Sequence, residues 1–375
     1  MIISTKYLIT GDGKTVLTDK AVYIGEDGKI GKIAPKEELL KEFPQEEVKE
    51  YGDATLLPGL MDMHAHLAYG YSQPDSFNYG AQLIMLYALQ HAQAAFERGI
   101  TTVRDMSSAH GVCKNLKLAE KKGFIVIPRI VHTDTGICMT GGHAWDEVEE
   151  ADGPWAIRKE IRKQVRDGAE WVKILTTNRE PYPEFTQEEL DAAVDECHRR
   201  GIKCGVHAGT NPGIQMCIDA GFDTIEHGTF MTLDHAKQMA EKGIAWTPTI
   251  MAYTYLYELC KENIEKNGDA PVSDPVMQKE MANYEFFEPA YKAYRDHFKE
   301  FYDTGVTVLA GTDMVIVSFS ALTASERTAI YGGIRNYTGA GSTGGNFQSG
   351  KGSGCGKRTR TCCRRTGCRS SGSWR

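Results

Sequence analysis

The sequence predicts an α/β protein: a (β/α)8 barrel of the TIM type preceded by a small N-terminal β domain. Eight short apolar segments alternate with polar, helix-like segments between residues 56 and 313, which favours a parallel sheet closed into a barrel. The alternative architecture is an open, doubly wound sheet. Such a sheet would carry a Gly-rich phosphate loop after its first strand, and the sequence has none after the first of these segments. The 375 residues, 41% of them hydrophobic, suffice for a barrel of roughly 250 residues and an accessory domain.

Residues 1–55 form the predicted β domain. The runs KYLIT (6–10) and AVYIG (21–25) have strand composition, and each is followed by a turn signal, GDGK or EDGK. We therefore expect short strands joined by tight turns, and a domain boundary near residue 55.

Residues 56–327 form the predicted barrel. Polar segments with helical periodicity, such as 187–200 and 233–242, separate its strands. The eight expected strands are 56–67, 101–106, 129–136, 171–175, 203–208, 224–228, 245–250 and 307–313. In such a barrel, catalytic side chains gather at the C-terminal ends of the strands.

Four histidines and an aspartate stand at these strand ends. His64 and His66 form an H-x-H pair, and residues two apart on a strand point to one side, so both imidazoles can bind one ion. His207 and His227 close the fifth and sixth strands, and Asp313 closes the eighth. Taken alone, either of the last two histidines is more often a hydrogen-bonded core or loop residue, and Asp313 could be a helix N-cap.

Lys173 interrupts the apolar run WVKIL. A strand of a parallel barrel is expected to be apolar on both faces. A buried lysine needs a partner or has to lose its charge. It is therefore either a site residue or one half of an ion pair at an edge.

Seven short motifs follow one another in a characteristic order. Their order and spacing resemble those of the metal-dependent amidohydrolase superfamily, in its prolidase-like and imidazolonepropionase-like branch, over roughly residues 1–315. The motifs are LLPGLMDMHAHL (56–67), GITTVRDM (99–106), TGGH (140–143), GAEWVKI (168–174), VHA (206–208), IEHG (225–228) and AGTD (310–313).

The resemblance implies a centre of two divalent metal ions. His64, His66 and Asp313 would bind the more buried ion, and His207 and His227 the second. Lys173 would bridge both ions after carboxylation by carbon dioxide. Zinc is the first expectation, with manganese, cobalt and iron as alternatives.

The same resemblance implies the reaction. A metal-activated hydroxide would attack an amide or peptide-like carbon–nitrogen bond, and Asp313 would carry the proton to the leaving nitrogen. His143 would bind the carbonyl or a substrate carboxylate, unless it belongs to a polar loop without a role. Arg104 is a candidate for a substrate carboxylate, although a structural ion pair is favoured. Asp62 would support the metal ligands or be simply an acid at a strand end. Tyr253 would line the mouth of the site or only pack.

The favoured substrates are Xaa-Pro dipeptides or N-acyl amino acids. A cyclic-amide hydrolase of the imidazolonepropionase type is the alternative, but that type uses one metal and lacks the bridging lysine, so Lys173 argues against it.

Composition limits the other partners. The net charge of −7 gives no support for nucleic-acid binding. No membrane-length apolar run and no signal peptide are evident, so we expect a cytoplasmic protein, and a homo-oligomer is compatible with the sequence. The six cysteines before residue 300 form no C-x-x-C pair, which indicates reduced, mostly buried thiols.

Residues 328–375 depart from the family. After Glu326 the chain has ten Lys and Arg and no Asp or Glu, and from Tyr331 onward it has 12 Gly and four Cys. A disordered Gly/Ser/Arg tail and a basic nucleic-acid arm are two interpretations. We favour a change of reading frame between roughly 315 and 331, because a shifted frame permits PEQALRAATFKAAKALGVEK from residue 338 and later DADLLVL, which resemble the family's last helix and closing strand.

The altered end has a structural consequence. In the resembling enzymes the C-terminal strands complete the small β domain as a composite β-sandwich, so this barrel would be incomplete at its C-terminal end. An inactive frameshifted product is therefore an alternative to an active hydrolase. A basic-tailed binding protein is a weaker one, because the tail lacks interleaved aromatic residues.

Overall fold

The structure is a computed structural model that describes residues 1–68, 80–177, 179, 181–268 and 274–313. The predicted tail 328–375 and the last part of the predicted barrel, 314–327, lie outside the described residues. The chain divides into two compact units. One consists of residues 1–60 and 97–99, and the other of 61–96 and 100–330 as far as these are described.

The first unit is built on a five-stranded sheet of order β3-β2-β1-β4, with β5 also paired to β1. Asp12 accepts hydrogen bonds from the N–H groups of Lys14 and Thr15, which fixes the turn between β1 and β2. A helix that the sequence analysis did not anticipate, α1 (Lys36–Glu42), places Leu39 in the small core. The strands are β1 (Ile2–Ile9), β2 (Val16–Ile24), β3 (Ile30–Ala34), β4 (Val48–Glu50) and β5 (Thr55–Leu56).

The second unit contains two sheets. The first has the order β6-β7-β8, and the second, all parallel, has the order β10-β9-β11-β12-β13-β14. An α/β fold with parallel sheets is thus confirmed. The strands are β6 (Leu60–Ala65), β7 (Ile100–Asp105), β8 (Arg129–His132), β9 (Ile137–Cys138), β10 (Glu149–Glu150), β11 (Trp171–Leu175), β12 (Lys203–Ala208), β13 (Thr224–His227) and β14 (Ala245–Thr247).

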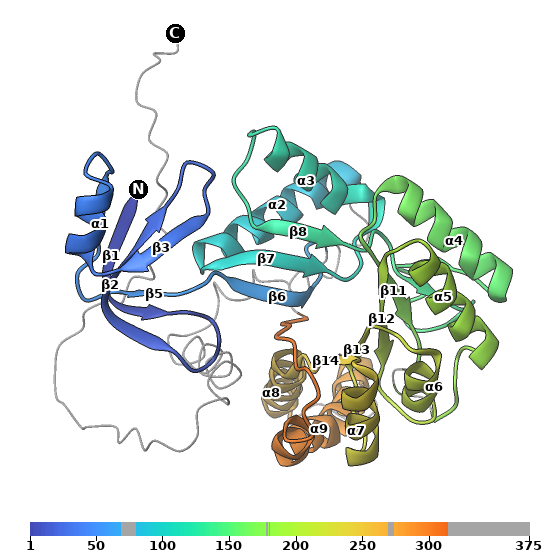
Figure 1. Ribbon diagram of the computed structural model, residues 1–375. Coiled ribbons are helices and arrows are strands. Elements are labelled where there is room, and N and C mark those ends of the chain that lie inside the picture. Colours follow the sequence, from blue (N-terminus) through green and yellow to red (C-terminus); the bar gives the residue numbers. More distant parts are fainter. Residues whose placement is uncertain (69–79, 178, 180, 269–273, 314–375) are drawn as a thin grey trace, which may run out of the picture. The chain divides into compact units, whose positions relative to one another are not determined.

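Helices alternate with the strands of this unit, and Figure 1 shows α4, α5 and α6 along one side of β11 and β12. The expected helix 187–200 is α5, whose capping box joins Thr186 and Glu189. The expected helix 233–242 is α7. The helices are α2 (Ala81–Glu97), α3 (Val112–Lys121), α4 (Pro154–Asp167), α5 (Gln187–Arg199), α6 (Gly213–Ala220), α7 (Leu233–Lys242), α8 (Ile250–Lys266) and α9 (Pro275–Tyr302), with the short helix η2 (Ala109–Gly111).

The expected eighth strand, 307–313, is only partly formed. It makes a single bridge to β14 and is otherwise irregular. Its backbone nevertheless bonds to strands on both sides, because Leu309 N donates to Trp246 O (2.8 Å) and Asp313 N donates to His64 O (2.7 Å). The segment therefore lies between β14 and β6.

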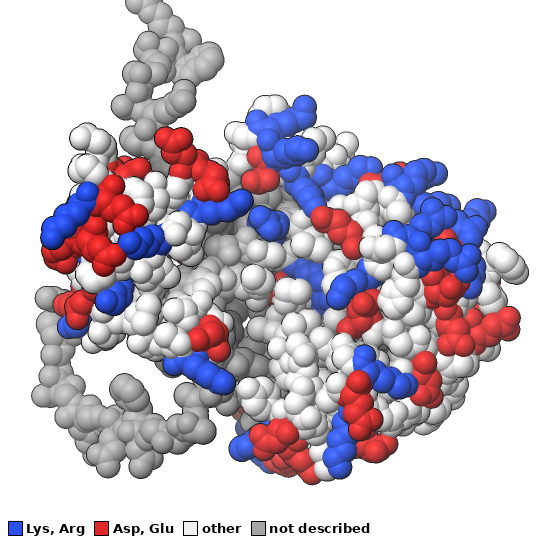
Figure 2. Space-filling model, in the orientation of Figure 1, with Lys and Arg blue, Asp and Glu red and all other residues white. Residues whose placement is uncertain are grey.

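The described surface carries mixed charge. Figure 2 shows basic and acidic side chains next to one another over α4 and α5. Ion pairs join these helices, including Arg158 with Asp195 and Arg162 with Glu196. Among the described helices, none has the length and apolar composition required to span a membrane.

Candidate functional site

His64 and His66 stand at the end of β6 with their imidazoles close together. Their Nε2 atoms lie 3.3 Å apart. Oδ1 of Asp313 lies 3.2 Å from Nε2 of His64 and 3.3 Å from Nε2 of His66. The three side chains thus bring two nitrogens and one carboxylate oxygen together, a group that could hold a metal ion.

Asp313 occupies the left-handed region, with φ at 54°, which aspartate tolerates better than most residues. Burial acts to raise the pKa of its carboxyl, but electrostatic interactions and hydrogen bonds with the surrounding imidazoles, chiefly those of His64 and His227, outweigh burial and hold this pKa well below its usual value. The carboxylate is therefore ionised at neutral pH, as a metal ligand or proton acceptor has to be.

His207 in β12 and His227 at the end of β13 lie beside this group. Their ring centroids are 4.4 Å apart. Nδ1 of His227 lies 2.7 Å from Oγ1 of Thr249 and 3.7 Å from Oδ2 of Asp313. Burial lowers the pKa of both histidines well below the usual value, so both are neutral imidazoles, the form that binds metals.

Lys173 lies in the middle of β11 with only 1% of its surface exposed. Its Nζ is 3.4 Å from Nε2 of His64. Within the described part of the chain it pairs with no carboxylate, so the edge ion pair considered above is not found. Burial lowers the pKa of the ammonium to about 8.

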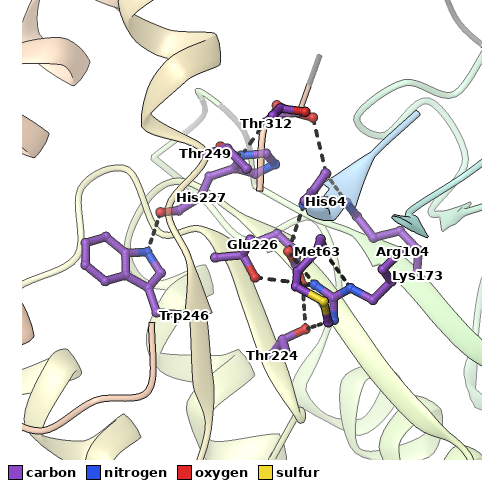
Figure 3. Close-up of polar contacts among 12 residues, drawn as sticks. Met63, His64, Arg104, Lys173, Thr224, Glu226, His227, Trp246, Thr249 and Thr312 are labelled. Atoms are coloured by element: carbon purple, nitrogen blue, oxygen red, sulfur yellow. Dashed lines mark hydrogen bonds and ion pairs between the residues drawn. The ribbon is translucent and has the colours of Figure 1, made fainter. Parts of the chain in front are cut away.

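Glu226, which the sequence analysis did not single out, lies behind His64 with no exposed surface. Its Oε2 is 2.7 Å from Nδ1 of His64, and its Oε1 accepts a hydrogen bond of 2.8 Å from Nη2 of Arg104 (Figure 3). Arg104 Nε also donates to the carbonyl of Met63 at 2.6 Å. The sequence does contain one indication of this ion pair, because each of the strand-like runs TTVRDM and TIEHG is interrupted by a charged residue, Arg104 or Glu226.

The expectation that Arg104 binds a substrate carboxylate is corrected by these contacts. The guanidinium is fully buried and faces Glu226. Its other side lies over the ring of Trp171, 4.5 Å from the ring centroid. The favoured alternative, a structural ion pair, agrees with this placement.

Asp62 and Tyr253 have supporting positions. Asp62 accepts hydrogen bonds from Oγ1 and N of Thr312, at 2.6 and 3.1 Å, and so joins β6 to the segment 307–313. Tyr253 is buried, its hydroxyl bonded to Thr229 and its ring centroid 5.8 Å from that of His227. Tyr253 therefore packs beside the imidazole of His227 and is buried, as in the packing alternative.

A cavity of about 290 Å³ opens beside His143. The ring centroid of His143 lies 4.2 Å from that of His207, so this histidine connects the cavity with the imidazole cluster. Arg179, Tyr182 and Glu184, which the sequence analysis did not identify, also line it, together with Met139, Gly141, Gly142 and Ala144.

Comparison with known proteins identifies the family. The model of the amidohydrolase family matches residues 55–341, which is more than half of the chain. The chain belongs to the amidohydrolase family. The resemblance noted in the motifs is thereby confirmed, and this amidohydrolase is a hydrolase acting on carbon–nitrogen bonds.

Three proteins illustrate the similarity. A Xaa-Pro dipeptidase, whose crystal structure has methionine bound in the active site, is 29% identical, with a TM-score of 0.70 over 84% of this amidohydrolase and 79% of that chain. The ochratoxinase of Aspergillus niger is 25% identical over 351 residues, which cover 83% of this chain and 68% of that protein. A prolidase complexed with N-methylphosphonate-L-proline has a TM-score of 0.69 at 22% identity, covers 84% of this chain and 79% of its own, and supports the fold alone.

Members of this family generally bind divalent metals, and the donor set of this amidohydrolase fits such ions. His64, His66 and Asp313 have ligand atoms that all lie within 4.8 Å of one another. The contact between His64 and Glu226 leaves Nε2 of the imidazole facing this group. A carboxylate that orients a histidine in this way is typical of metal sites.

Proposed function

We propose that this amidohydrolase cleaves the amide bond of Xaa-Pro dipeptides or N-acyl amino acids at a centre of two divalent metal ions. One observation carries the proposal: His143 lies between the imidazole cluster and a cavity that also contains Arg179 and Glu184. A small substrate held by these charged groups would present its amide bond to the cluster.

Five side chains would hold the ions. His64, His66 and Asp313 would bind the more buried ion, and His207 and His227 the second. Zinc is the metal we expect first, because neutral imidazole and carboxylate ligands suit it. When bound, such ions would activate a water molecule and polarise the scissile carbonyl.

Lys173 would complete this centre as a carboxylated lysine. The neutral amine is the form that adds carbon dioxide, and burial lowers the pKa of Lys173 to about 8, which increases the neutral fraction at neutral pH. Carboxylation forms an N–C bond, releases a proton and gives an anion with two oxygen donors. It also removes the cost of a buried ammonium group without an ionic partner.

Asp313 and His143 would act on the substrate. The carboxylate of Asp313 lies within 3.3 Å of both His64 and His66, where it would accept a proton from the attacking water and pass it to the leaving nitrogen. His143 would bind the scissile carbonyl or the substrate carboxylate from the cavity side.

Arg179 and Glu184 would recognise the two ends of a dipeptide. A guanidinium pairs well with a carboxylate, and Glu184 would attract an α-ammonium group. The centre of the Arg179 guanidinium lies 4.4 Å from the ring centroid of Phe286, which supports its orientation. The similarity to a Xaa-Pro dipeptidase with bound methionine favours a substrate that yields a free amino acid.

We also propose that the two parallel sheets form one closed eight-stranded barrel. The segment 307–313 bonds to β14 and to β6, and Glu170 N donates to His132 O at 3.0 Å across the interval between β8 and β11. These bonds lie at the two places where one sheet would have to join the other, and so support a closed barrel. Closure would bring all the proposed ligands to one end of the barrel.

The test is a panel of Xaa-Pro dipeptides, N-acyl amino acids and a cyclic amide, assayed on protein whose metal content is measured. We expect about two ions per chain and hydrolysis of at least one of the first two classes. Cleavage of the cyclic amide alone would favour the imidazolonepropionase type. If the folded protein neither binds metal nor hydrolyses any substrate after zinc and bicarbonate are added, the inactive frameshifted product would be favoured.

Arg179→Met tests the substrate class directly. We expect kcat/KM for free-acid substrates to fall about 10- to 100-fold, because a hydrogen-bonded ion pair contributes about 1.5–3 kcal/mol. Substrates with an amidated C-terminus should change little. Arg295→Met, at an exposed arginine of α9, is the matched control, and equal losses for acid and amide substrates would contradict the assignment of Arg179.

A further inference from the structure

A second group of potential ligands lies away from the proposed metal centre. It consists of His198 near the end of α5, Cys204 at the beginning of β12 and Asp223 immediately before β13. His207 stands three residues after Cys204 on β12, which corresponds to about 10 Å along the strand. The group therefore belongs to the opposite, N-terminal side of the parallel strands.

The three ligand atoms converge on one point. Nε2 of His198 lies 2.9 Å from Oδ2 of Asp223, and Sγ of Cys204 lies 3.8 Å from the same oxygen. All three atoms lie within 4.8 Å of one another. Bonds of about 2.0–2.3 Å around a tetrahedral zinc ion separate its ligands by roughly 3.3–3.8 Å, so small side-chain movements would suffice to bind such an ion.

The backbone holds this arrangement in place. The N–H of Cys204 donates to Oδ2 of Asp223 at 2.9 Å, which orients the carboxylate toward the thiol. Cys204 is fully buried, whereas the side chain of His198 is 46% exposed. An ion can therefore enter past the imidazole, with the thiol beneath it and solvent available for the fourth position.

The charge of the group suits a divalent ion. An imidazole, a thiolate and a carboxylate together supply two negative charges, which would balance the charge of such an ion. Lys203 approaches Oδ1 of Asp223 at 3.8 Å, whereas the imidazole of His198 and the thiol of Cys204 face Oδ2.

We propose that His198, Cys204 and Asp223 form a binding site for a thiophilic divalent cation, with zinc as the natural occupant, separate from the proposed catalytic centre. The mixed nitrogen, sulfur and oxygen donors match zinc and softer ions such as cadmium. The alternative is a histidine–aspartate ion pair above Cys204, with the cysteine serving only as part of the hydrophobic core.

Cadmium titration tests the site through thiolate-to-metal charge-transfer absorption. The proposed catalytic centre contains no cysteine, so this ultraviolet signal distinguishes the two sites, whatever the outcome at the catalytic centre. The titration uses the full-length chain in which the four tail cysteines are changed to serine: Cys355, Cys362, Cys363 and Cys368. We expect the signal to saturate at about one equivalent of thiolate-bound cadmium per chain.

Two variants in this background should lose the signal, and two should keep it. His198→Ala removes an exposed ligand with little risk to folding, and Cys204→Ser replaces the sulfur by oxygen. His297→Ala, at an exposed histidine of α9, and Cys217→Ser, at another buried cysteine, are the matched controls. Absence of the signal in the background chain, or its persistence in His198→Ala, would overturn the proposal and leave an ion pair above a core cysteine.

Discussion

At the scale of single residues, the orientation of His64 depends on a contact that the H-x-H motif does not reveal. Glu226 approaches Nδ1 at 2.7 Å, and Arg104 compensates the buried carboxylate. Burial alone would raise the pKa of Glu226, but the charge of Arg104 and the hydrogen bond with His64 hold it below its usual value. The carboxylate therefore remains ionised and orients the imidazole.

Glu226→Gln should weaken metal binding about 10- to 100-fold, as loss of a carboxylate behind a metal-bound histidine does. It should also lower the free energy of unfolding by about 3–5 kcal/mol, because Arg104 would lose its buried partner. Calorimetric metal titration and denaturant unfolding measure these effects separately. Glu241→Gln, at an exposed position of α7, is the control, and unchanged metal affinity in Glu226→Gln would show that Glu226 only balances the charge of Arg104.

Lys173→Met should reduce the metal content from about two ions per chain to about one, because the ligand shared by both ions would be lost. Carbon-13 NMR after addition of labelled bicarbonate should show a carbamate signal in the wild-type protein and none in this variant. Lys237→Met, at an exposed lysine of α7, should keep both the signal and the metal. A variant of Lys173 that retains two ions would show that this lysine has a structural role.

The residues that the sequence could indicate are those with a local pattern. His64 and His66 share a strand face, and Lys173 interrupts an apolar run. The pocket residues Arg179, Tyr182 and Glu184 lie in a loop without periodicity, and their convergence on His143 depends on tertiary structure. The sequence leaves two roles open for Arg104, because nothing in TTVRDM reveals that its partner, Glu226, lies in TIEHG.

At the scale of elements, strong local signals predicted the structure best. The helices 187–200 and 233–242 were predictable because each combines amphipathic periodicity with a capping residue, Thr186 or Thr232. The segment 307–313 has strand composition but forms only one bridge, and its last residue, Asp313, adopts the left-handed conformation. The seven-residue helix α1 was missed because a short, charged segment has little periodicity.

Strand β12 has a glycine at the point where the buried ion pair needs space. A Cβ atom on Gly205 would lie 2.6 Å from Oγ1 of Thr224 and 2.9 Å from Oε1 of Glu226. Gly205→Ala should therefore lower the free energy of unfolding by about 1–3 kcal/mol through overpacking, and should also weaken metal binding by displacing Glu226. Gly268→Ala, where the new Cβ would make only ordinary contacts, is the control, and wild-type stability of Gly205→Ala would contradict this account.

At the scale of the whole molecule, the proposed ligands all belong to the second unit, and none lies in residues 1–60. The proposed change of reading frame, between roughly 315 and 331, lies outside the described residues. It therefore stays a prediction. The nucleotide sequence decides it. We expect the shifted frame to run without a stop codon through the predicted last helix and closing strand, and an early stop codon would refute the idea.

Metal removal should destabilise the second unit, because the proposed ligands come from β6, β11, β12, β13 and the segment 307–313. These elements are far apart in the sequence, and ions bound to the folded state but not to the unfolded chain stabilise it by mass action. At a metal concentration about 100-fold above the dissociation constant, this stabilisation amounts to about 3 kcal/mol, so the thermal midpoint should fall by about 5–10 °C after chelation.

Calorimetry before and after chelation measures this shift of the midpoint, and added zinc with bicarbonate should restore the midpoint. The shift should persist in His198→Ala, which lacks the second proposed site, formed by His198, Cys204 and Asp223. A thermal midpoint unchanged by complete metal removal would mean that the five elements hold together without the ions.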